Sequence, residues 1–163
     1  MTDVTFQPRE LLRALSDHGV KFVVIGGFAV SAHGYPRATR DLDVVPDPSA
    51  ENMQRLAAAI SKLDGQLVGV DAELLGIQLD AETFAEGANF PLNTTYGRLD
   101  ILQEMRDQKL HGQVAQDAIE VNIGGVQVLV CSLRALREMK QAAGRPQDIA
   151  DLEALAGNLT GPQ

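Results

Sequence analysis

Apolar residues recur along the chain with two different spacings, one typical of helices and the other of short strands. Leucines lie on one helical face within residues 8–18, between Pro8, which is tolerated in a first helical turn, and Gly19, which can end a helix. Short apolar runs that are bounded by glycine, proline or aspartate predict strands. We expect strands over residues 21–25, 41–45, 66–70, 89–95, 98–103, 119–123 and 126–131.

Further helices are expected between and after these strands. Ser49 and Ser132 each precede an apolar helical pattern and can serve as N-caps, and Pro146 can begin a last helix. In that last helix we expect Ile149, Leu152 and Leu155 to point inward. The predicted helices cover residues 8–18, 27–33, 49–63, 132–144 and 146–156.

The connections between the elements predict part of the topology. Tyr96-Gly97 and Gly124-Gly125 each separate two strand-like runs, which is a hairpin signal. The helix over residues 49–63 returns the chain, so we expect the strand over 66–70 to lie parallel to the strand over 41–45, through a right-handed crossover. The remaining segments are expected to be short helix and loop over residues 71–88, and exposed helix or loop over residues 105–117.

The length of 163 residues is that of one domain with its own core. The pattern predicts an α+β fold, an α/β two-layer arrangement in which a mixed twisted sheet carries helices mainly on one face. We expect this single domain to span residues 1–156 and a C-terminal tail to cover residues 157–163.

Composition narrows the classes of function. The chain has 14 Lys and Arg against 22 Asp and Glu, a formal charge of -8, so its surface as a whole repels nucleic acid. Cys131 has no partner for an internal disulfide and is expected in the core. No signal-like N-terminus and no apolar run of roughly 20 residues is present, so we expect a cytoplasmic protein without membrane association.

The segment over residues 21–45 carries the chemistry. Its first strand stops at Gly26-Gly27, where backbone amides can face an anion without obstruction by side chains. A glycine pair on its own is a weak signal, because many strand-to-helix turns use glycine only for their geometry. Asp41 and Asp43 open the next strand two residues apart, so that both carboxylates point to the same side and predict bound Mg²⁺ or Mn²⁺.

Asp100 is a third acid, and it lies between apolar residues of another strand. A carboxylate in that setting needs a partner, which could be a cation or the guanidinium of Arg98 or Arg37. If the strand of Asp100 lies beside the strand of Asp41 and Asp43, three carboxylates converge and repel each other unless a divalent metal lies between them. Two such ions can support an in-line phosphoryl or nucleotidyl transfer.

Gly26-Gly27, Asp41-x-Asp43 and Asp100 together resemble the polymerase-β-like nucleotidyltransferase superfamily. The longer string Arg37-x-Thr39-x-Asp41-Leu42-Asp43 resembles its minimal bacterial members, the AbiEii-like and toxin–antitoxin nucleotidyltransferases. Lys140 and Arg145-Pro146-x-Asp148-x-x-Asp151 are similar to later motifs of that group. The resemblance implies that Asp41, Asp43 and Asp100 are catalytic and bind the metals.

The same resemblance implies a nucleoside triphosphate (NTP) substrate whose phosphates lie on the glycine turn. The second turn position is Gly27 rather than serine, so Ser31 would have to supply any hydroxyl contact. Arg37 and Arg40 either contact the phosphates or form ion pairs with Asp41 or Asp47. The residues expected to bind the nucleotide are Gly26, Gly27, Ser31, Arg37, Thr39, Arg40 and Lys140.

Each of the C-terminal motif residues also has a structural interpretation. Lys140 is by default a solvated charge on the helical face opposite Leu136 and Met139, and only the family motif suggests that it binds the nucleotide. Asp148 and Asp151 are first-turn acids that favour the start of a helix at Pro146. His33 and His111 are left out of catalysis, because lone histidines are more often helix-end or surface residues.

The resulting hypothesis is a metal-dependent nucleotidyltransferase, which moves a nucleoside monophosphate (NMP) from an NTP to a hydroxyl of a protein, RNA or small molecule. The resemblance implies a toxin–antitoxin or phage-defence setting, with a toxin or antitoxin as protein partner. RNA as acceptor is implied by the toxin relatives and opposed by the net charge. The alternative hypothesis is a catalytically weak nucleotide-binding or antitoxin-like partner module on the same fold.

Overall fold

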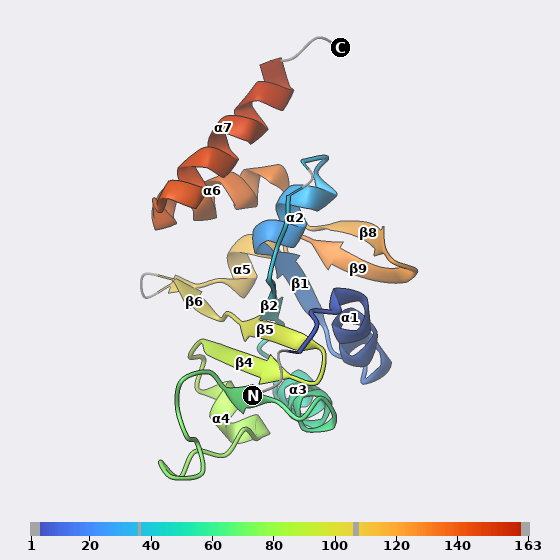
Figure 1. Cartoon of the computed structure of the whole chain (residues 1–163), viewed down its shortest axis with the longest axis vertical. Coiled ribbons are helices and arrows are strands. Elements are labelled where there is room, and N and C mark those ends of the chain that lie inside the picture. Colours follow the sequence, from blue (N-terminus) through green and yellow to red (C-terminus); the bar gives the residue numbers. More distant parts are fainter. Residues whose placement is uncertain (1–3, 36, 106–107, 161–163) are drawn as a thin grey trace.

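A computed structural model describes residues 4–35, 37–105 and 108–160 (Figure 1). Strands and helices alternate along the chain. The strands are β1 (Phe22–Ile25), β2 (Asp41–Pro46), β3 (Gln66–Leu67), β4 (Phe90–Thr94), β5 (Gly97–Ile101), β6 (Glu104–Met105), β7 (Gln108–Lys109), β8 (Ile119–Ile123) and β9 (Val126–Val130). The helices are α1 (Pro8–Asp17), α2 (Gly26–Ala32), α3 (Ala50–Lys62), α4 (Ala81–Ala85), α5 (His111–Val114), α6 (Leu133–Ala143) and α7 (Pro146–Thr160).

One mixed sheet organises the fold, with seven strands in the order β3-β4-β5-β2-β1-β9-β8. In it β1 runs antiparallel to β2 and parallel to β9, while β2 runs parallel to β5. The predicted α+β fold with a mixed sheet is therefore confirmed. Within the described residues, the small strands β6 and β7 pair with each other in a separate two-stranded sheet.

The sheet buries apolar side chains against helices. Helix α1 contacts β9 and β2, and α3 contacts β2. Leu42 and Val44 of β2 and Leu99 and Ile101 of β5 are completely buried in the core. Because successive side chains of a strand alternate between its faces, this burial directs Asp41, Asp43 and Asp100 to the other face.

Several predicted boundaries are confirmed by their caps. The hydroxyl oxygen of Ser49 accepts from the backbone N–H of Asn52, and that of Ser132 accepts from the N–H of Ala135. Gly144 ends α6 in the left-handed conformation, with φ 63°. The β8–β9 hairpin turns at Gly124-Gly125 as predicted, because Ile123 pairs with Val126.

The prediction for residues 66–70 was wrong. Only Gln66 and Leu67 form a strand, β3, and it pairs antiparallel with β4 at the edge of the sheet. The place parallel to β2 is taken by β5 instead. Gly69 has φ 73°, a left-handed conformation that ends the extended segment and precludes the expected crossover strand.

Two other expectations need smaller corrections. The β4–β5 hairpin turns at Thr95 and Tyr96, one residue earlier than predicted, because Gly97 already pairs with Thr94. Residues 105–117 are not simply exposed, since Leu110 and Val114 are buried in the core beside β6, β7 and α5.

Helix α7 reaches Thr160, so the helix continues past residue 157, where the tail was expected to begin. Residues 161–163 lie outside the described residues. The single domain over residues 1–156 stays a prediction. Among the described helices, none combines the length and the apolar character that crossing a bilayer requires.

Candidate active site

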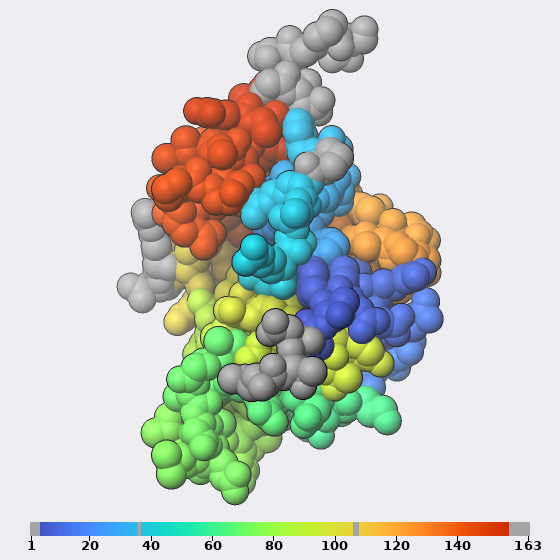
Figure 2. Space-filling view, in the orientation of Figure 1, coloured from blue at the N-terminus to red at the C-terminus, as the bar shows by residue number. Residues whose placement is uncertain are grey.

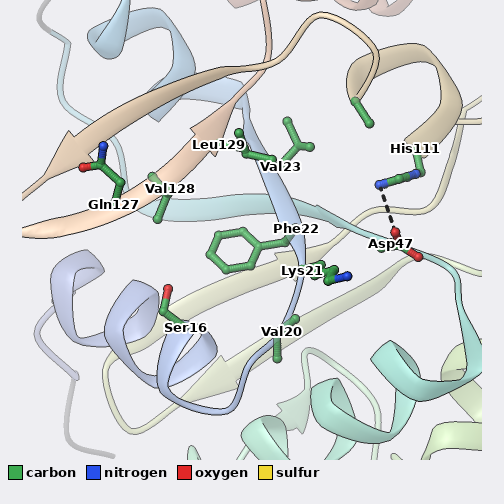
Figure 3. A pocket seen from close by; sticks show the side chains of 11 residues that line it. Ser16, Val20, Lys21, Phe22, Val23, Asp47, His111, Gln127, Val128 and Leu129 are labelled. Carbon is green, nitrogen blue, oxygen red and sulfur yellow. Dashed lines mark ion pairs between the residues drawn. The ribbon is translucent and has the colours of Figure 1, made fainter.

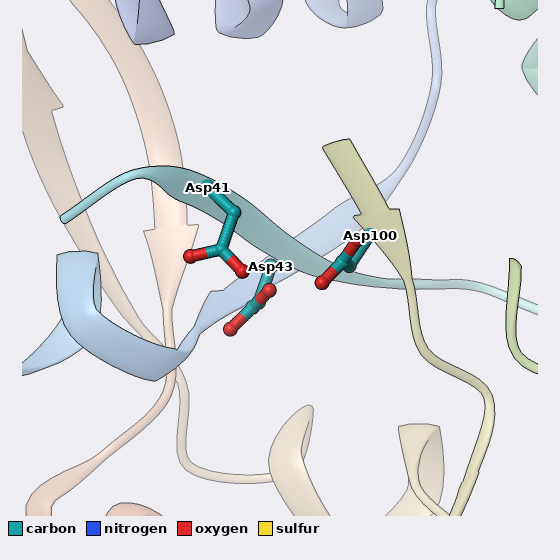
Figure 4. A group of neighbouring side chains, drawn as sticks. All are labelled: Asp41, Asp43 and Asp100. Carbon is teal, nitrogen blue, oxygen red and sulfur yellow. The ribbon is translucent and has the colours of Figure 1, made fainter. Parts of the chain in front are cut away.

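Strand pairing brings the three predicted acids together. In the β2–β5 ladder Asp43 lies opposite Asp100, and Asp41 lies one step along the same face of β2. Figure 4 shows the three carboxylates pointing toward one another from the two strands. One oxygen from each lies within 4.8 Å of the others. The predicted convergence of acids from two separate segments is therefore confirmed, whereas their catalytic role stays a prediction.

Asp100 takes part in both arrangements that the sequence left open. Its Oδ1 accepts a hydrogen bond from Nε of Arg98 at 2.8 Å, so Arg98 and not Arg37 is its cationic partner. The same carboxylate lies in the acidic cluster. The ion pair therefore anchors Asp100 without turning it away from Asp41 and Asp43.

Burial and mutual repulsion oppose ionisation of this cluster. Burial, followed by the charges of Asp41 and Asp100, raises the pKa of Asp43 to about 7, against the opposing charge of Lys140. Burial also raises the pKa of Asp100, although Arg98 lowers it. Among the described residues, Oδ1 of Asp43 is a buried atom that has no hydrogen-bond partner.

This donor set fits a divalent cation. Carboxylate oxygens are the ligands that Mg²⁺ and Mn²⁺ prefer in proteins. A bound cation would supply Asp43 Oδ1 with a partner and would remove the repulsion that raises the pKa of Asp43. Asp41, Asp43 and Asp100 are therefore the residues that could hold the metal.

The glycine turn lies against the same cluster. Gly26 has φ 72°, and a Cβ atom at this position would lie 2.2 Å from Oδ2 of Asp43. Glycine is thus needed at position 26 both for its backbone conformation and for the close approach of the carboxylate. The register agrees, because Ile25, the residue before the turn, pairs with Asp43.

The structure explains why position 27 is not serine. A Cβ atom on Gly27 would lie 2.3 Å from Cγ2 of Thr39 and 3.5 Å from Cζ of Arg37. The side chain of Thr39 thus fills the space that a serine would need. Ser31, the predicted substitute for that hydroxyl, lies half-buried on α2.

Arg37 and Arg40, the two arginines that were predicted to bind the nucleotide, border an open groove beside Asp41. Arg40 is exposed there, and Arg98 extends from β5. The groove has a volume of about 560 Å³ and is lined by Arg37, Ala38, Thr39, Arg40, Asp41, Asn93 and Arg98. Three arginines and one aspartate thus line this groove, whereas acids outnumber basic residues in the protein as a whole.

A second hollow lies on the other side of the acids. Leu102 continues the ladder beyond β5, with its N–H donating to the carbonyl of Val44, and lies two residues beyond Asp100. Apolar side chains form much of this hollow of about 510 Å³, which is lined by Asn89, Leu102, Glu104, Met105, Leu110, Ala143 and Arg145. One face of β5 thus runs from a basic groove at Arg98, past Asp100, to an apolar hollow.

Arg37 pairs with neither acid considered from the sequence. Its Nη1 donates to Oδ2 of Asp151, a residue of α7 that is far away in the chain. In the space-filling view the red surface of α7 abuts the cyan segment that leads into β2 (Figure 2). The ion pair therefore connects the loop before the acidic strand to the C-terminal helix.

Lys140 is buried, contrary to the solvated charge that is the default for such a residue. Its side chain is 8% exposed, and its Nζ contacts Asp148 Oδ1 at 3.3 Å and Asp151 Oδ2 at 2.8 Å. Burial alone would raise the pKa of Asp148, but hydrogen bonds from Arg145 and the charge of Lys140 lower it overall. A buried ion network thus joins α6 to α7.

The sequence analysis missed the burial of Asp148 and Asp151 and expected Ile149 to point inward instead. Ile149 is 51% exposed, whereas both acids and Leu155 are buried. A usable signal was present in the helical phase. Asp148, Asp151 and Leu155 recur at the i, i+3, i+7 spacing of one helical face, which an apolar-only reading of the pattern overlooks.

A further hollow of about 350 Å³ lies at the opposite end of β1 from the glycine turn (Figure 3). Phe22, Val23 and Val128 form apolar parts of its lining, and His111 faces Asp47 there at 4.0 Å. None of the acids at 41, 43 and 100 borders it. His33 is also structural, because its Nε2 contacts the carbonyl oxygen of Cys131 at 2.8 Å.

Comparisons with known proteins point to one class of enzyme. The family described as nucleotidyl transferase AbiEii toxin of a type IV toxin–antitoxin system matches residues 10–134. No curated protein sequence matches the chain significantly.

Solved structures with the same fold include a putative nucleotidyltransferase from Thermotoga maritima, an antibiotic-resistance factor and an antibiotic adenylyltransferase. The solution structure of the antibiotic-resistance factor ANT(2'')-Ia gives a TM-score of 0.60 at 19% identity, over 94% of this chain and 82% of that one. The lincosamide antibiotic adenylyltransferase LnuA, bound to lincomycin, gives 0.57 at 16% identity, over 93% and 98% of the two chains. At these identities the likeness concerns the fold alone.

Asp43→Asn should stabilise the metal-free protein at neutral and alkaline pH. The pKa of Asp43 is about 7 in the folded protein against 3.8 as the ordinary value, so folded-state stability falls as pH rises through that interval. At pH 8 we expect the free energy of unfolding of the variant to exceed that of the wild type by at least about 1 kcal/mol. Near pH 4 we expect little difference. Urea denaturation in chelator at both pH values measures this.

Asp117→Asn is the matched control. Hydrogen bonds from Arg134 lower the pKa of Asp117, so its neutralisation should not stabilise the protein at pH 8. Equal stability of wild type and Asp43→Asn at pH 8 would contradict the repulsive cluster.

Gly26→Ala should destabilise the protein more than Gly125→Ala does. Both glycines have positive φ, but only a Cβ at position 26 meets Asp43, while one at 125 meets nothing within 4 Å. The additional loss for Gly26→Ala should be about 1–3 kcal/mol, the usual cost of overpacking. Urea denaturation of the two variants isolates this contact, and equal losses would show that Asp43 does not press on the turn.

Proposed function

Because the chain belongs to the AbiEii nucleotidyl transferase toxin family, we propose that it transfers an NMP from an NTP to an acceptor hydroxyl. The single observation that supports this most strongly is the meeting of Asp41, Asp43 and Asp100 beside the Gly26 turn. That arrangement places a cluster of carboxylates beside a glycine turn, and the two together suit a metal-bound polyphosphate.

The acids have distinct parts in this proposal. Asp41, Asp43 and Asp100 would hold Mg²⁺ or Mn²⁺, and the bound ion would supply charge neutralisation at the reacting phosphates. Asp100 is also the residue that we propose as the general base. Burial raises its pKa, and Arg98 keeps its carboxylate fixed while a proton moves.

The reaction exchanges one phosphorus–oxygen bond for another. The acceptor oxygen bonds to the α-phosphorus, the bond from that phosphorus to the bridging oxygen breaks, and pyrophosphate leaves with the electron pair. The proton of the acceptor hydroxyl passes to Asp100. No covalent enzyme intermediate is needed, so the protein contributes mainly positioning and electrostatics.

The residues around the glycine turn bind the phosphates in this proposal. The backbone amides of Gly26 and Gly27 face them, and Arg37 and Lys140 supply positive charge. Thr39 shapes the turn by occupying the space above Gly27, and Ser31 on α2 offers a hydroxyl from the next helical turn. Arg40 lies in the basic groove, where an anionic part of either substrate can bind.

The two hollows beside the acids suit different parts of the substrates. The hollow at Leu102 and Met105 combines apolar side chains with a few polar ones, which is the kind of lining that accommodates a nucleobase. The groove at Arg98 is left for the acceptor, which we propose to be a hydroxyl of a protein, RNA or small molecule. A toxin–antitoxin setting with a protein partner fits the family description.

A transfer assay tests the proposal. The protein is incubated with each NTP, labelled at the α-phosphate, in Mg²⁺ and with a panel of acceptors. The panel contains bulk RNA, proteins, an aminoglycoside and a lincosamide, since related structures hold adenylyl-2''-tobramycin and lincomycin. We expect label on one acceptor class and at least a 100-fold loss for Asp41→Asn, Asp43→Asn and Asp100→Asn. Asp117→Asn, outside the site, should keep wild-type activity.

Calorimetry distinguishes the proposed enzyme from a nucleotide-binding module. We expect Mg²⁺ to tighten NTP binding at least about tenfold in the wild type and to have little effect in Asp43→Asn, because Asp43 would be one of the residues that hold the ion. NTP binding that ignores Mg²⁺, together with no incorporation of label by the wild type, would instead support a catalytically weak module.

A further inference from the structure

Asp151 holds two cations with a single oxygen atom. Its Oδ2 accepts from Nζ of Lys140 at 2.8 Å and from Nη1 of Arg37, and its Oδ1 accepts from Nε2 of Gln147 at 2.9 Å. The side chain of Asp151 is only 5% exposed. Both of its oxygens are thus occupied by donors from the protein.

Asp148 is equally committed. Its Oδ2 accepts from the backbone N–H and from Nε of Arg145, at 3.1 and 2.7 Å, and its Oδ1 contacts Lys140 at 3.3 Å. Its side chain is 2% exposed. Both carboxylates are buried and accept hydrogen bonds from protein donors. Neither Asp148 nor Asp151 is therefore placed to take a proton from an acceptor.

The cations held in this way lie beside the glycine turn and the acids. Cζ of Arg37 lies 3.5 Å from the place that a Gly27 Cβ would occupy. The charge of Lys140 acts on Asp43, and the charges of Asp43 and Asp41 act on Arg145. The network therefore borders the site from the side of α6 and α7.

Within the network two acids, Asp148 and Asp151, are shared among three cations, Arg37, Lys140 and Arg145. The charges of Asp41 and Asp43 also act on Arg145, so the cations lie between the two groups of acids. Arginine and lysine side chains are the donors that proteins use to bind phosphate groups. The glycine turn beside Arg37 is where the proposed function puts the NTP phosphates.

We infer that Asp151 is a positioning residue, which holds Arg37 and Lys140 in place to bind the polyphosphate of the nucleotide. This makes α7 a part of the nucleotide site, although it lies beyond residues 10–134, the part of the chain that the family match covers. The inference rests on the proposed function for the identity of the nucleotide, but the polyphosphate contact can be measured without any transfer.

Asp151→Asn tests the inference by calorimetry with inorganic tripolyphosphate and Mg²⁺ as the probe. Asparagine keeps the shape but loses the charge that holds both cations, so we expect the dissociation constant to rise at least about tenfold. In a transfer assay KM for the NTP should rise by a similar factor, and kcat should change less. Asp117→Asn, which loses an ion pair with Arg134 elsewhere on α6, is the control and should bind as the wild type does.

Two further variants separate positioning from general loss of structure. Asp151→Glu keeps the charge and should recover part of the affinity. Arg37→Gln should weaken binding by itself, and adding Asp151→Asn to it should cost less than in the wild type, because one of the two held cations is already gone. Thermal melting shows whether each variant is folded. If Asp151→Asn is unfolded, the binding data for Arg37→Gln and Asp151→Glu test the inference instead.

Each outcome separates this inference from the proposed function. Wild-type binding of tripolyphosphate that Asp151→Asn weakens supports the inference even if no NMP transfer is found. Equal binding by wild type and Asp151→Asn overturns it, even if the enzyme is active. Failure of the wild type to bind tripolyphosphate at all also overturns it.

Discussion

The structure depends on one electrostatic conflict, which strand pairing creates. The apolar residues of β2 and β5 must face the core, and their burial forces Asp41, Asp43 and Asp100 onto the opposite face in matching register. Hydrophobic burial thus drives like charges together. Neighbouring cations offset part of the repulsion among these carboxylates, since Arg98 pairs with Asp100 and the charge of Lys140 acts on Asp43. What is left uncompensated, the buried Oδ1 of Asp43, marks the place for a cation.

Much of this arrangement could be predicted because it is local or periodic. Short windows of sequence contain several of these signals: the alternation in residues 41–45, the glycine pair at 26 and 27, and the caps at Ser49 and Ser132. The meeting of Asp100 with Asp43 was a long-range expectation, made on the condition that their two strands lie side by side. It succeeded because an acid between apolar strand residues requires a partner, and the acidic strand was the place where a metal could supply one.

The predictions that were wrong depended on competition between segments. Nothing within residues 66–70 reveals that β5 takes the place beside β2 and leaves β3 at the edge. Likewise, the ion pair between Arg37 and Asp151 joins residues that only the folded chain brings together, so local ion pairs with Asp41 or Asp47 seemed the natural alternatives. In α7 the buried face is polar, and a search for apolar periodicity therefore selected Ile149 in place of the two acids.

The shared oxygen of Asp151 has a consequence for the entropy of ligand association. Free lysine and arginine side chains each lose about 2 kcal/mol of rotamer freedom when they become fixed. Here Lys140 and Arg37 are immobilised during folding, so an anion that arrives at the glycine turn meets side chains that are already ordered. Preorganisation of this kind favours recognition of a small charged ligand.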